Sequence, residues 1–515
     1  METRSVANLA GLPGFDRAMA SQRRFAQLDD AGYRTPLFPD QAPDTVLNEW
    51  LAVIEEETGG AGSIFELEQS EVKKFGPYYN RPYREWKGNV EKYFVHDISS
   101  MEQALPEELE RAMNSEIELI KSYLPNGKVR ALSVQEAYER SNKNTNLGLP
   151  YAMNHQTAAQ KVVDEYVRRA NKIVRGDDPH IYPFILFKRV QPGGPEREDG
   201  KNRPVWGADH AETYASLSLL YPLLDALSNT REFAHLRGID ELEKVLKLDL
   251  PKWSHAISLD LSAADANFSP VLMSCGFQMI SALVDGVDPR MIYTLYKYYV
   301  SGELLTPEGL AYGAHGMPSG VGLTNLIESL VFRVLARIYL EDFPTYRYYQ
   351  NGDDGLYLVN SIPEPEELAG VFAKYGCVVN VDKTSTDPHH ISYLQRHMYP
   401  EYGYSAIMST VRMLNRVLYA ERGVDAKAMG MSPKDFWTLN TIAKLENCKR
   451  NPLFEKFVRF VRRGDKFGLD PKPVLNKSVN AIEGYSVFRI DEGETGSQRS
   501  SSGLLNFATV KVLLQ

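Results

Sequence analysis

The sequence predicts an α+β fold in which a small antiparallel sheet, flanked by helices, carries acidic side chains where its strands end. Three observations predict it. Residues 349–359 contain two strand-like runs on either side of the turn-forming sequence Asn351–Gly352–Asp353–Asp354. Residues 256–259 form a short apolar run that ends in Asp260. Residues 326–335 have the apolar spacing of a helix and follow a glycine-rich loop.

The first element, the hairpin, places the carboxylates of Asp353 and Asp354 side by side. Adjacent like charges repel, so the pair favours a site that a cation neutralises. A hard divalent cation such as Mg²⁺ takes few protein carboxylates and leaves positions open for phosphate oxygens. The alternative is an ordinary hairpin turn, because Asn, Gly and Asp are common turn formers.

The second element supplies the partner acids. If a strand ends at Asp260, its carboxylate projects from the sheet edge, where it meets Asp353; Asp265 follows five residues after Asp260. Carboxylates from two adjacent strands hold two metal ions about 3.5–4 Å apart, an arrangement that clamps both oxygens of an in-line phosphoryl displacement. The alternative for Asp260 is a helix cap together with Ser262.

The third element is the glycine-rich loop of residues 315–325, which runs into the predicted helix. Its glycines allow the backbone to approach a ligand closely and to adopt positive φ. Thr324 and Asn325 stand at the junction between loop and helix. A loop that merely caps a core helix is the competing interpretation.

In this order and spacing, the three segments resemble motifs A, B and C of viral RNA-dependent RNA polymerases. The matches are D-x4-D from Asp260, SG-x3-TN from Ser319, and GDD at 352–354. Further segments resemble four other motifs of the family: 144–151 (G), 188–189 with 201–206 (F), 375–384 (D) and 392–396 (E). The chain length and the SGVGLTN form of motif B resemble the polymerases of small double-stranded RNA viruses of the picobirnavirus and partitivirus type.

The resemblance implies a right-hand architecture of fingers, palm and thumb that is closed by the fingertips. The palm would hold the antiparallel sheet flanked by helices. The implied divisions are an N-terminal extension bridging fingers and thumb (1–125), fingers with motifs G and F (126–245), a palm with motifs A–E (246–396) and an inserted fingers segment (276–314), a thumb (397–490) and a C-terminal tail (491–515).

It also implies the catalytic groups. Asp260 and Asp353 would be the main ligands of two Mg²⁺ or Mn²⁺ ions, and Asp354 an auxiliary ligand or a neighbour that tunes them. The main-chain carbonyl of Leu261 would complete one coordination sphere. Lys383, at the position of the motif D lysine, would protonate the leaving pyrophosphate; an ordinary exposed lysine beside Asp382 is the alternative.

Nucleotide selection would fall to motifs A and B. Asp265 and Asn325 would recognise the ribose 2′-hydroxyl, which distinguishes RNA from DNA precursors, with Ser319 and Thr324 beside them. Reverse transcriptases, as a family, carry a bulky steric block near this position of motif A, so an acid here favours ribonucleotides. A solvated turn acid is the alternative for Asp265.

Two further sets complete the predicted site. Basic side chains over the triphosphate would stabilise developing charge: Lys188, Arg189, Lys201 and Arg203. A solvated surface face remains the alternative for Lys188 and Arg189. The residues expected to contact RNA are Gly148, Pro150, Gly320, Gln395 and Arg396.

Composition limits the other classes of function. The net charge of −9 argues against a surface uniformly devoted to nucleic acid and favours a basic inner channel under an acidic exterior. The three cysteines, Cys275, Cys377 and Cys448, form no CxxC pair, so neither a zinc site nor a disulfide framework is predicted. We expect no signal peptide and no membrane-spanning segment, because no apolar run approaches about 18 residues.

Together these features predict an RNA-templated RNA polymerase that serves viral genome replication and transcription. Its partners would be RNA template and product and nucleoside triphosphates, with a capsid protein as a further candidate, in the virion interior and the host cytoplasm. Two alternatives stay open: a reverse transcriptase, and a non-catalytic RNA-binding component of a viral particle.

Overall fold

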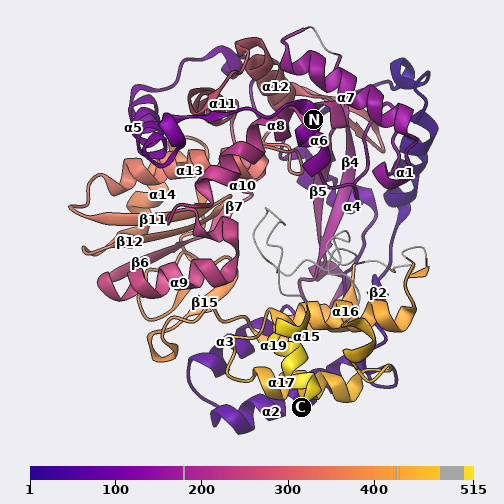
Figure 1. Ribbon diagram of the computed structural model, residues 1–515, viewed down its shortest axis with the longest axis vertical. Helices are drawn as coiled ribbons and strands as arrows, with labels where there is room; N and C mark the ends of the chain where they lie inside the picture. Colours follow the sequence, from indigo (N-terminus) through magenta and orange to yellow (C-terminus); the bar gives the residue numbers. More distant parts are fainter. Residues whose placement is uncertain (178–179, 422, 424–425, 428–429, 476–503) are drawn as a thin grey trace.

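The computed structural model describes residues 1–515 except 178–179, 422, 424–425, 428–429 and 476–503. The chain mixes helices and antiparallel strands, as the predicted α+β class requires. Figure 1 shows three lobes, with the strands β6, β11 and β12 in one, β4 and β5 in a second, and a group of helices below both. Within the described residues, no helix combines the length and apolar character needed to span a bilayer.

The palm lobe is built on a three-stranded antiparallel sheet with the order β11–β12–β6. Its central strand β12 is buried along its length after Asp354, so both of its faces are covered by protein. Side chains alternate between the faces: Tyr357 packs toward the helix α13, whereas Leu356 and Leu358 pack toward α9 and the β14–β15 hairpin. The palm elements are α9 (Ile239–Asp249), β6 (His255–Leu259), β7 (Leu261–Ser262), α10 (Ala264–Asn267), α13 (Thr324–Leu340), β11 (Tyr346–Asn351), β12 (Asp354–Val359), α14 (Pro365–Ala373), β13 (Val378–Val379), β14 (Ile391–Tyr393) and β15 (Arg396–Met398).

The fingers lobe centres on a five-stranded sheet with the order β1–β10–β9–β4–β5. The long β4–β5 ribbon crosses toward the helices below (Figure 1), where the amide of Val190 donates to Glu421 Oε1 at 2.7 Å. This contact joins the tip of the fingers ribbon to the thumb lobe. The fingers elements are β3 (Val129–Arg130), α6 (Val134–Arg140), α7 (Gln160–Val174), β4 (Phe184–Gln191), β5 (Lys201–Gly207), α8 (His210–Leu227), α11 (Pro270–Leu283), β8 (Val284–Asp285), α12 (Pro289–Ser301), β9 (Leu304–Thr306) and β10 (Gly309–Tyr312).

The thumb lobe has its own apolar core, in which Trp50 and Ile54 pack with residues of the thumb helices such as Phe457. The chain end also docks there, where the amide of Thr509 donates to Glu446 at 3.0 Å. The thumb elements are α15 (Thr410–Leu418), β16 (Tyr419–Ala420), α16 (Pro433–Glu446), α17 (Phe454–Gly464) and α19 (Ala508–Leu514).

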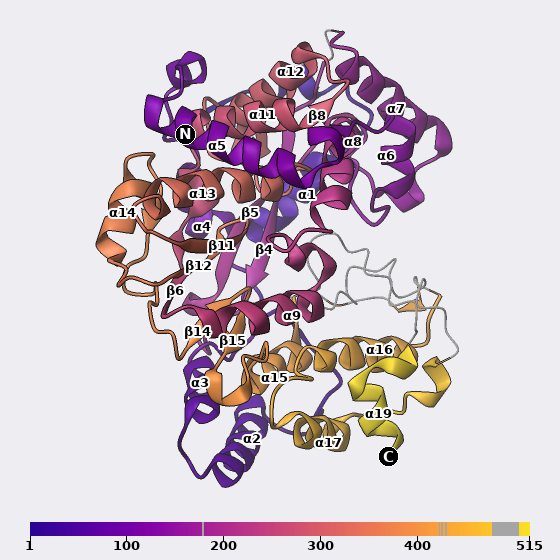
Figure 2. The same cartoon turned by 60° about the vertical axis from the view of Figure 1, so that its left-hand side comes forward.

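The N-terminal segment contacts all three lobes. Its strand β1 joins the fingers sheet, its helices α2 and α3 pack in the thumb core, and α5 lies along α13 and α11 of the palm side (Figure 2). The elements are β1 (Glu2–Arg4), α1 (Phe15–Gln27), β2 (Tyr33–Arg34), α2 (Pro43–Thr58), α3 (Ser63–Val72), α4 (Tyr83–Glu91) and α5 (Glu107–Tyr123).

Two of the predicted divisions fall inside helices. Residue 245 lies within α9 and residue 276 within α11, so each helix continues across the expected boundary. A boundary inside a helix would cut its hydrogen-bonded turns, and neither position is a structural division. The predicted end of the thumb (476–490) and the first part of the predicted tail (491–503) lie outside the described residues.

Candidate active site

The two acids of the predicted turn lie at the end of the palm hairpin. Asn351 pairs with Asp354, which leaves Gly352 and Asp353 as a two-residue loop. Gly352 has a φ of +56°, and a Cβ there would lie 3.0 Å from Asn325 Nδ2, so both conformation and space favour glycine. The loop is therefore held against the start of α13.

Asp260 meets this hairpin because β6 pairs with β12. Gly355 stands opposite Leu259, so the next residues of the two antiparallel strands, Asp354 and Asp260, emerge at the same end of the sheet. The chain after β6 is fixed by the motif D segment: the amide of Asn380 donates to the Asp260 carbonyl at 2.8 Å, and Leu261 pairs with Val379 in β13.

Burial and neighbouring acids raise the pKa values of Asp353 and Asp354. Loss of hydration and the negative charges of Asp265 and Asp260 raise the pKa of Asp353 although it is exposed, and Arg203 opposes this rise. Burial and the charges of Asp353 and Asp260 raise the pKa of Asp354 to about 7. These effects show that side chains from β6, the turn and the segment after β6 converge in space.

The donor set fits a hard divalent cation. Among the described residues, no Lys or Arg forms an ion pair with Asp260, Asp353 or Asp354, and the charges of Arg203 and Arg412 do not prevent the rise in the pKa values of Asp353 and Asp354. Carboxylate oxygens are the ligands that Mg²⁺ prefers. In the described part of the chain, no three such side chains already surround one metal position.

Motif B, residues 319–325, lies next to the turn that carries Asp353. Thr324 Oγ1 donates to the carbonyl of Pro318 at 2.9 Å and closes the loop, while Ser319 lies half-buried next to β5. Asn325 faces the Gly352 turn. One turn later, Ser329 Oγ accepts from the Gly352 amide at 2.7 Å and donates to the Asn325 carbonyl at 2.6 Å.

The register of the β4–β5 ribbon sorts the predicted cations. Arg189 stands opposite Arg203, and Lys201 stands opposite Gln191, so Arg189, Arg203 and Lys201 share one face. Burial lowers the pKa of Lys201, and repulsion from Arg203 and Lys383 lowers it further. The charge of Arg203 acts on Asp353, that of Asp260 acts on Lys201, and the exposed Lys383 of motif D interacts with Lys201, so these cations lie near the acids.

Lys188 does not belong to this set. It stands opposite Pro204, on the other face of the ribbon, and its Nζ donates to the Arg81 carbonyl at 3.3 Å. Burial lowers the pKa of Lys188 to about 8, against the opposing charges of Asp30 and Glu421. The expected triphosphate contact through Lys188 is therefore corrected: the side chain faces the N-terminal segment and the thumb.

The residues expected to touch RNA divide in the same way. Gly320 is exposed at a φ of +107°. Gln395 is exposed at the tip of the β14–β15 hairpin, with a φ of +58°. In contrast, Gly148 and Pro150 are buried, and a Cβ on Gly148 would lie 2.1 Å from the Ala208 carbonyl oxygen. These two residues pack inside the fingers, so the expected RNA contact is corrected for them.

Arg396 requires the same correction. It is 3% exposed, and its Nη2 donates to Asn447 Oδ1 at 3.0 Å, so it joins the palm hairpin to the thumb core. Its neighbour Gln395 accepts instead from Arg412 at 2.6 Å and from Arg416 at 3.3 Å. These two thumb arginines bring positive charge to the hairpin tip.

Some groups near the acids were not predicted from the sequence. Ser329 follows Asn325 by four residues, and helical spacing alone would have placed the two on one face. Thr384 accepts from the Asp260 amide at 3.3 Å through Oγ1, and Arg412 and Arg416 reach the site from α15. No local pattern marks these three, because their partners lie far along the chain.

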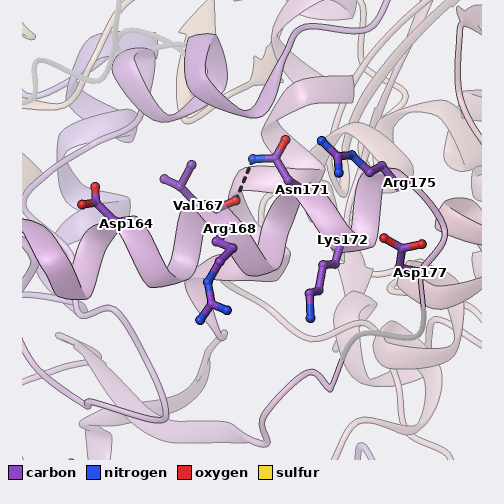
Figure 3. Close-up of a pocket in the computed structure, with 7 residues that line it drawn as sticks. All are labelled: Asp164, Val167, Arg168, Asn171, Lys172, Arg175 and Asp177. Atoms are coloured by element: carbon purple, nitrogen blue, oxygen red, sulfur yellow. Dashed lines mark hydrogen bonds between the residues drawn. The ribbon is translucent and has the colours of Figure 1, made fainter.

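A shallow, open cavity of about 480 Å³ lies elsewhere, along the fingers helix α7 (Figure 3). Figure 3 shows Arg168 and Lys172 pointing to one side of the helix, while Asn171 donates back to the Val167 carbonyl at 2.9 Å. The lining residues are Asp164, Val167, Arg168, Asn171, Lys172, Arg175 and Asp177. None of them belongs to the predicted site, so this cavity is separate from the palm acids.

Comparison with known families decides what this arrangement belongs to. The family model described as viral RNA-dependent RNA polymerase matches residues 77–449, well over half of the chain, and this region includes all the palm acids. The chain belongs to the viral RNA-dependent RNA polymerases. The predicted enzyme class is thereby confirmed, and RNA and nucleotides are the substrates that this class implies.

The relatives agree with the narrower resemblance to picobirnavirus polymerases. A protein of human picobirnavirus described as a potential RNA-dependent RNA polymerase is 25% identical over 457 residues, 84% of this chain and 82% of that protein. The genome polyprotein of bovine enteric calicivirus NB is 27% identical over 222 residues, 38% of this chain and 10% of the polyprotein.

Solved structures confirm the right-hand fold. The crystal structure of the RNA-dependent RNA polymerase of a human picobirnavirus matches with a TM-score of 0.82 and 21% identity, covering 100% of this chain and 99% of that one. The sicinivirus 3Dpol RNA-dependent RNA polymerase matches with a TM-score of 0.55 and 15% identity, over 73% of this chain and 83% of that one.

Proposed function

We propose that this polymerase copies RNA by two-metal-ion nucleotidyl transfer, with Asp260 and Asp353 as the main ligands and Asp354 and the Leu261 carbonyl as auxiliary ones. The observation that carries the proposal is the convergence of acids that form no ion pair among the described residues, together with the raised pKa values of Asp353 and Asp354. When bound, Mg²⁺ or Mn²⁺ ions lower the pKa of the primer 3′-hydroxyl and neutralise charge on the phosphates.

The residues of the chain bind and orient the reactants. Arg189, Lys201 and Arg203 share the ribbon face beside the acids, where they would hold the triphosphate. Asp265 and Asn325 would hydrogen-bond the ribose 2′-hydroxyl. A site built to bind a hydroxyl rejects the analogue that lacks it, because its polar groups are then left unpaired.

Lys383 would donate a proton to the leaving pyrophosphate. Its exposure and the interaction of its charge with Lys201, itself a proposed triphosphate ligand, support this role. We expect Lys383→Arg to slow the chemical step while nucleotide binding stays nearly intact, since arginine keeps the charge but does not release a proton. Equal rates of the chemical step in rapid-quench measurements would reject this role.

The deciding experiment is an extension assay with purified protein, an unprimed template carrying a viral genome end, Mg²⁺ and labelled nucleotides. We expect ribonucleotide incorporation that needs the metal and is lost in Asp353→Ala. Asp382→Ala is the matched control, because that acid is exposed and belongs to the motif D turn. Metal-independent synthesis, or full activity in Asp353→Ala, would overturn the proposal.

The same assay separates the alternatives. Preference for deoxynucleotides would indicate a reverse transcriptase, and binding of RNA without extension would indicate a non-catalytic virion component. Within the proposal, the enzyme replicates and transcribes a viral genome in the virion interior and the host cytoplasm. A capsid protein is its expected partner, and co-sedimentation of the two proteins would test that contact.

A further inference from the structure

The hydroxyl of Tyr93 lies between two residues of the nucleotide-selecting motifs. It is 3.4 Å from Asp265 Oδ2 and 3.4 Å from Ser319 Oγ. Tyr93 belongs to the N-terminal segment and follows α4, so it comes from neither motif A nor motif B. No local sequence pattern connects it to either motif.

The backbone around Tyr93 fixes this position. Its carbonyl accepts from the Gly316 amide at 2.8 Å, and the Asp265 carbonyl accepts from the Met317 amide at 2.8 Å. Further along the same segment, the ring of His96 hydrogen-bonds the Ala266 carbonyl at 2.8 Å. The N-terminal segment therefore joins the ends of motifs A and B from outside the palm.

The ring of Tyr93 is also held. It is 6% exposed and packs against Trp206, with 5.6 Å between ring centroids. The amide of Trp206 donates in turn to the Ser319 carbonyl at 2.8 Å. The phenol thus has little freedom to swing away from its two partners.

The number of available protons determines which groups donate in the hydrogen bonds among Tyr93, Asp265 and Ser319. An ionised Asp265 only accepts, so the single hydroxyl proton of Tyr93 goes to it. Ser319 Oγ then donates either to Tyr93 or to the Pro204 carbonyl, which lies 3.3 Å away. Burial and the charge of Asp265 raise the pKa of Tyr93 well above its usual value, so the proton is retained.

We propose that Tyr93 is a positioning residue that orients the Asp265 carboxylate and Ser319 for recognition of the ribose 2′-hydroxyl. This inference rests on the proposed function of Asp265. The phenol holds one carboxylate oxygen, which leaves the other to face the sugar. Without that contact the carboxylate rotates away from the sugar. The efficiency of incorporation then falls more for ribonucleotides than for nucleotides that lack the 2′-hydroxyl.

The test is single-nucleotide incorporation on a primed RNA template with UTP and with 2′-deoxy-UTP. We expect Tyr93→Phe to lower the ratio of kcat/KM for UTP to kcat/KM for 2′-deoxy-UTP about tenfold, mainly through a higher KM for UTP, since hydrogen bonds to charged groups are stronger than those between neutral groups. A variant that only loosened the fold would lower both kcat/KM values together and leave their ratio unchanged.

The matched control is Tyr296→Phe. Tyr296 is also buried, and its hydroxyl donates to the Met101 carbonyl at 2.9 Å, away from the nucleotide site. We expect the ratio of kcat/KM for UTP to kcat/KM for 2′-deoxy-UTP to be the same in this variant as in the wild type. Thermal unfolding of both variants verifies that removal of one oxygen atom preserves the fold.

Two further variants make the test independent of that single substitution. Asp265→Asn with and without Tyr93→Phe should show the same ratio, because Tyr93 acts through Asp265. Ser319→Ala, which removes the second partner, should lower the ratio less than Tyr93→Phe. An unchanged ratio in both Tyr93→Phe and Ser319→Ala overturns the inference. If the wild-type protein shows no metal-dependent extension at all, the proposed function is overturned instead.

Discussion

Two sites with acidic side chains lie against the same palm elements, β11 and α13, and differ in how the negative charge is balanced. Glu116 of α5 is fully buried and accepts from Arg333 at 2.6 Å and from Arg337 at 2.7 Å. Tyr348 of β11 adds a hydroxyl donor. Burial alone would raise the pKa of Glu116, but the two arginines outweigh it and lower the pKa.

The acids of the proposed metal site lie at the other end of the same strand and helix. Asp353 and Asp354 follow β11, and Asn325 and Ser329 begin α13, but no described cation pairs with the two acids and their pKa values are raised. A buried charge that the fold balances internally holds elements together. A charge that the fold leaves unbalanced is reserved for a ligand, at a cost in stability.

Asp353→Asn should show the largest difference between its effect on activity and its effect on stability. We expect elongation to fall by about a thousandfold or more, because several kcal/mol of transition-state charge stabilisation is lost. The free energy of unfolding should stay the same or rise, since the substitution removes a repulsive charge without breaking an ion pair. Elongation assays and urea unfolding in chelator measure the two quantities; a large loss of stability would break the comparison.

Glu116→Gln should show the opposite pattern. Removing one partner of a buried ion network leaves Arg333 and Arg337 uncompensated, which costs about 3–5 kcal/mol of unfolding free energy. At a temperature where the variant stays folded, elongation per folded molecule should remain within about threefold of wild type. Urea unfolding with active-site titration tests this, and full stability would show that the arginines find other partners.

The cationic ribbon offers a matched pair on its two faces. Arg203 faces the unbalanced acids, whereas Lys188 has Asp30 and Glu421 on its own side. We expect Arg203→Gln to raise the nucleotide KM about tenfold, as loss of a charged contact to phosphate implies. Lys188→Gln should change KM less than about twofold. Steady-state kinetics measures both, and equal effects would contradict the assignment of faces.

The smallest effect should appear in the pH dependence of stability without metal. Asp354 has a pKa of about 7 in the folded protein against 3.8 ordinarily, so the folded state binds the extra proton between these values. Its contribution to stability is present at low pH and is lost as pH rises toward 7. Thermal unfolding in chelator across this window should show the trend, and Asp354→Asn should remove it.

Glu116 predicts the reverse sign for its own titration. Its folded pKa lies below 4.5, so its contribution is present above that pH and is lost as pH falls further. The Glu116 window lies below pH 4.5, whereas the Asp354 window extends up to about pH 7, so wild-type unfolding curves above pH 4.5 follow Asp354 without a contribution from Glu116.

The sequence was sufficient where function depends on residues near one another in the chain. The two strand-like runs around Asp353 and the apolar run before Asp260 predicted both the hairpin and its neighbour strand. Lys188 could not be placed in this way, because a shift of one residue in strand register moves a side chain to the opposite face. The face of the ribbon on which Lys188 lies is determined by its pairing with Pro204.

Long-range packing explains the remaining differences. Arg396 is buried because Asn447 of the thumb meets it, and Gly148 is buried because the Ala208 carbonyl packs on it. Tyr93 reaches Asp265 across 172 residues of sequence. No local periodicity encodes such partners, so these positions follow from the tertiary structure alone.

The hydroxyl of Ser329 joins two tasks that are often treated as separable. It accepts from the amide of Gly352 in the turn that carries Asp353, and it donates to the carbonyl of Asn325, the residue proposed to bind the ribose. Under the proposed function, one side chain therefore connects the metal-binding turn with the residue that selects the sugar. We expect a substitution at Ser329 to change copying speed and error rate together, so a viral lineage would not alter one of these traits alone at this position.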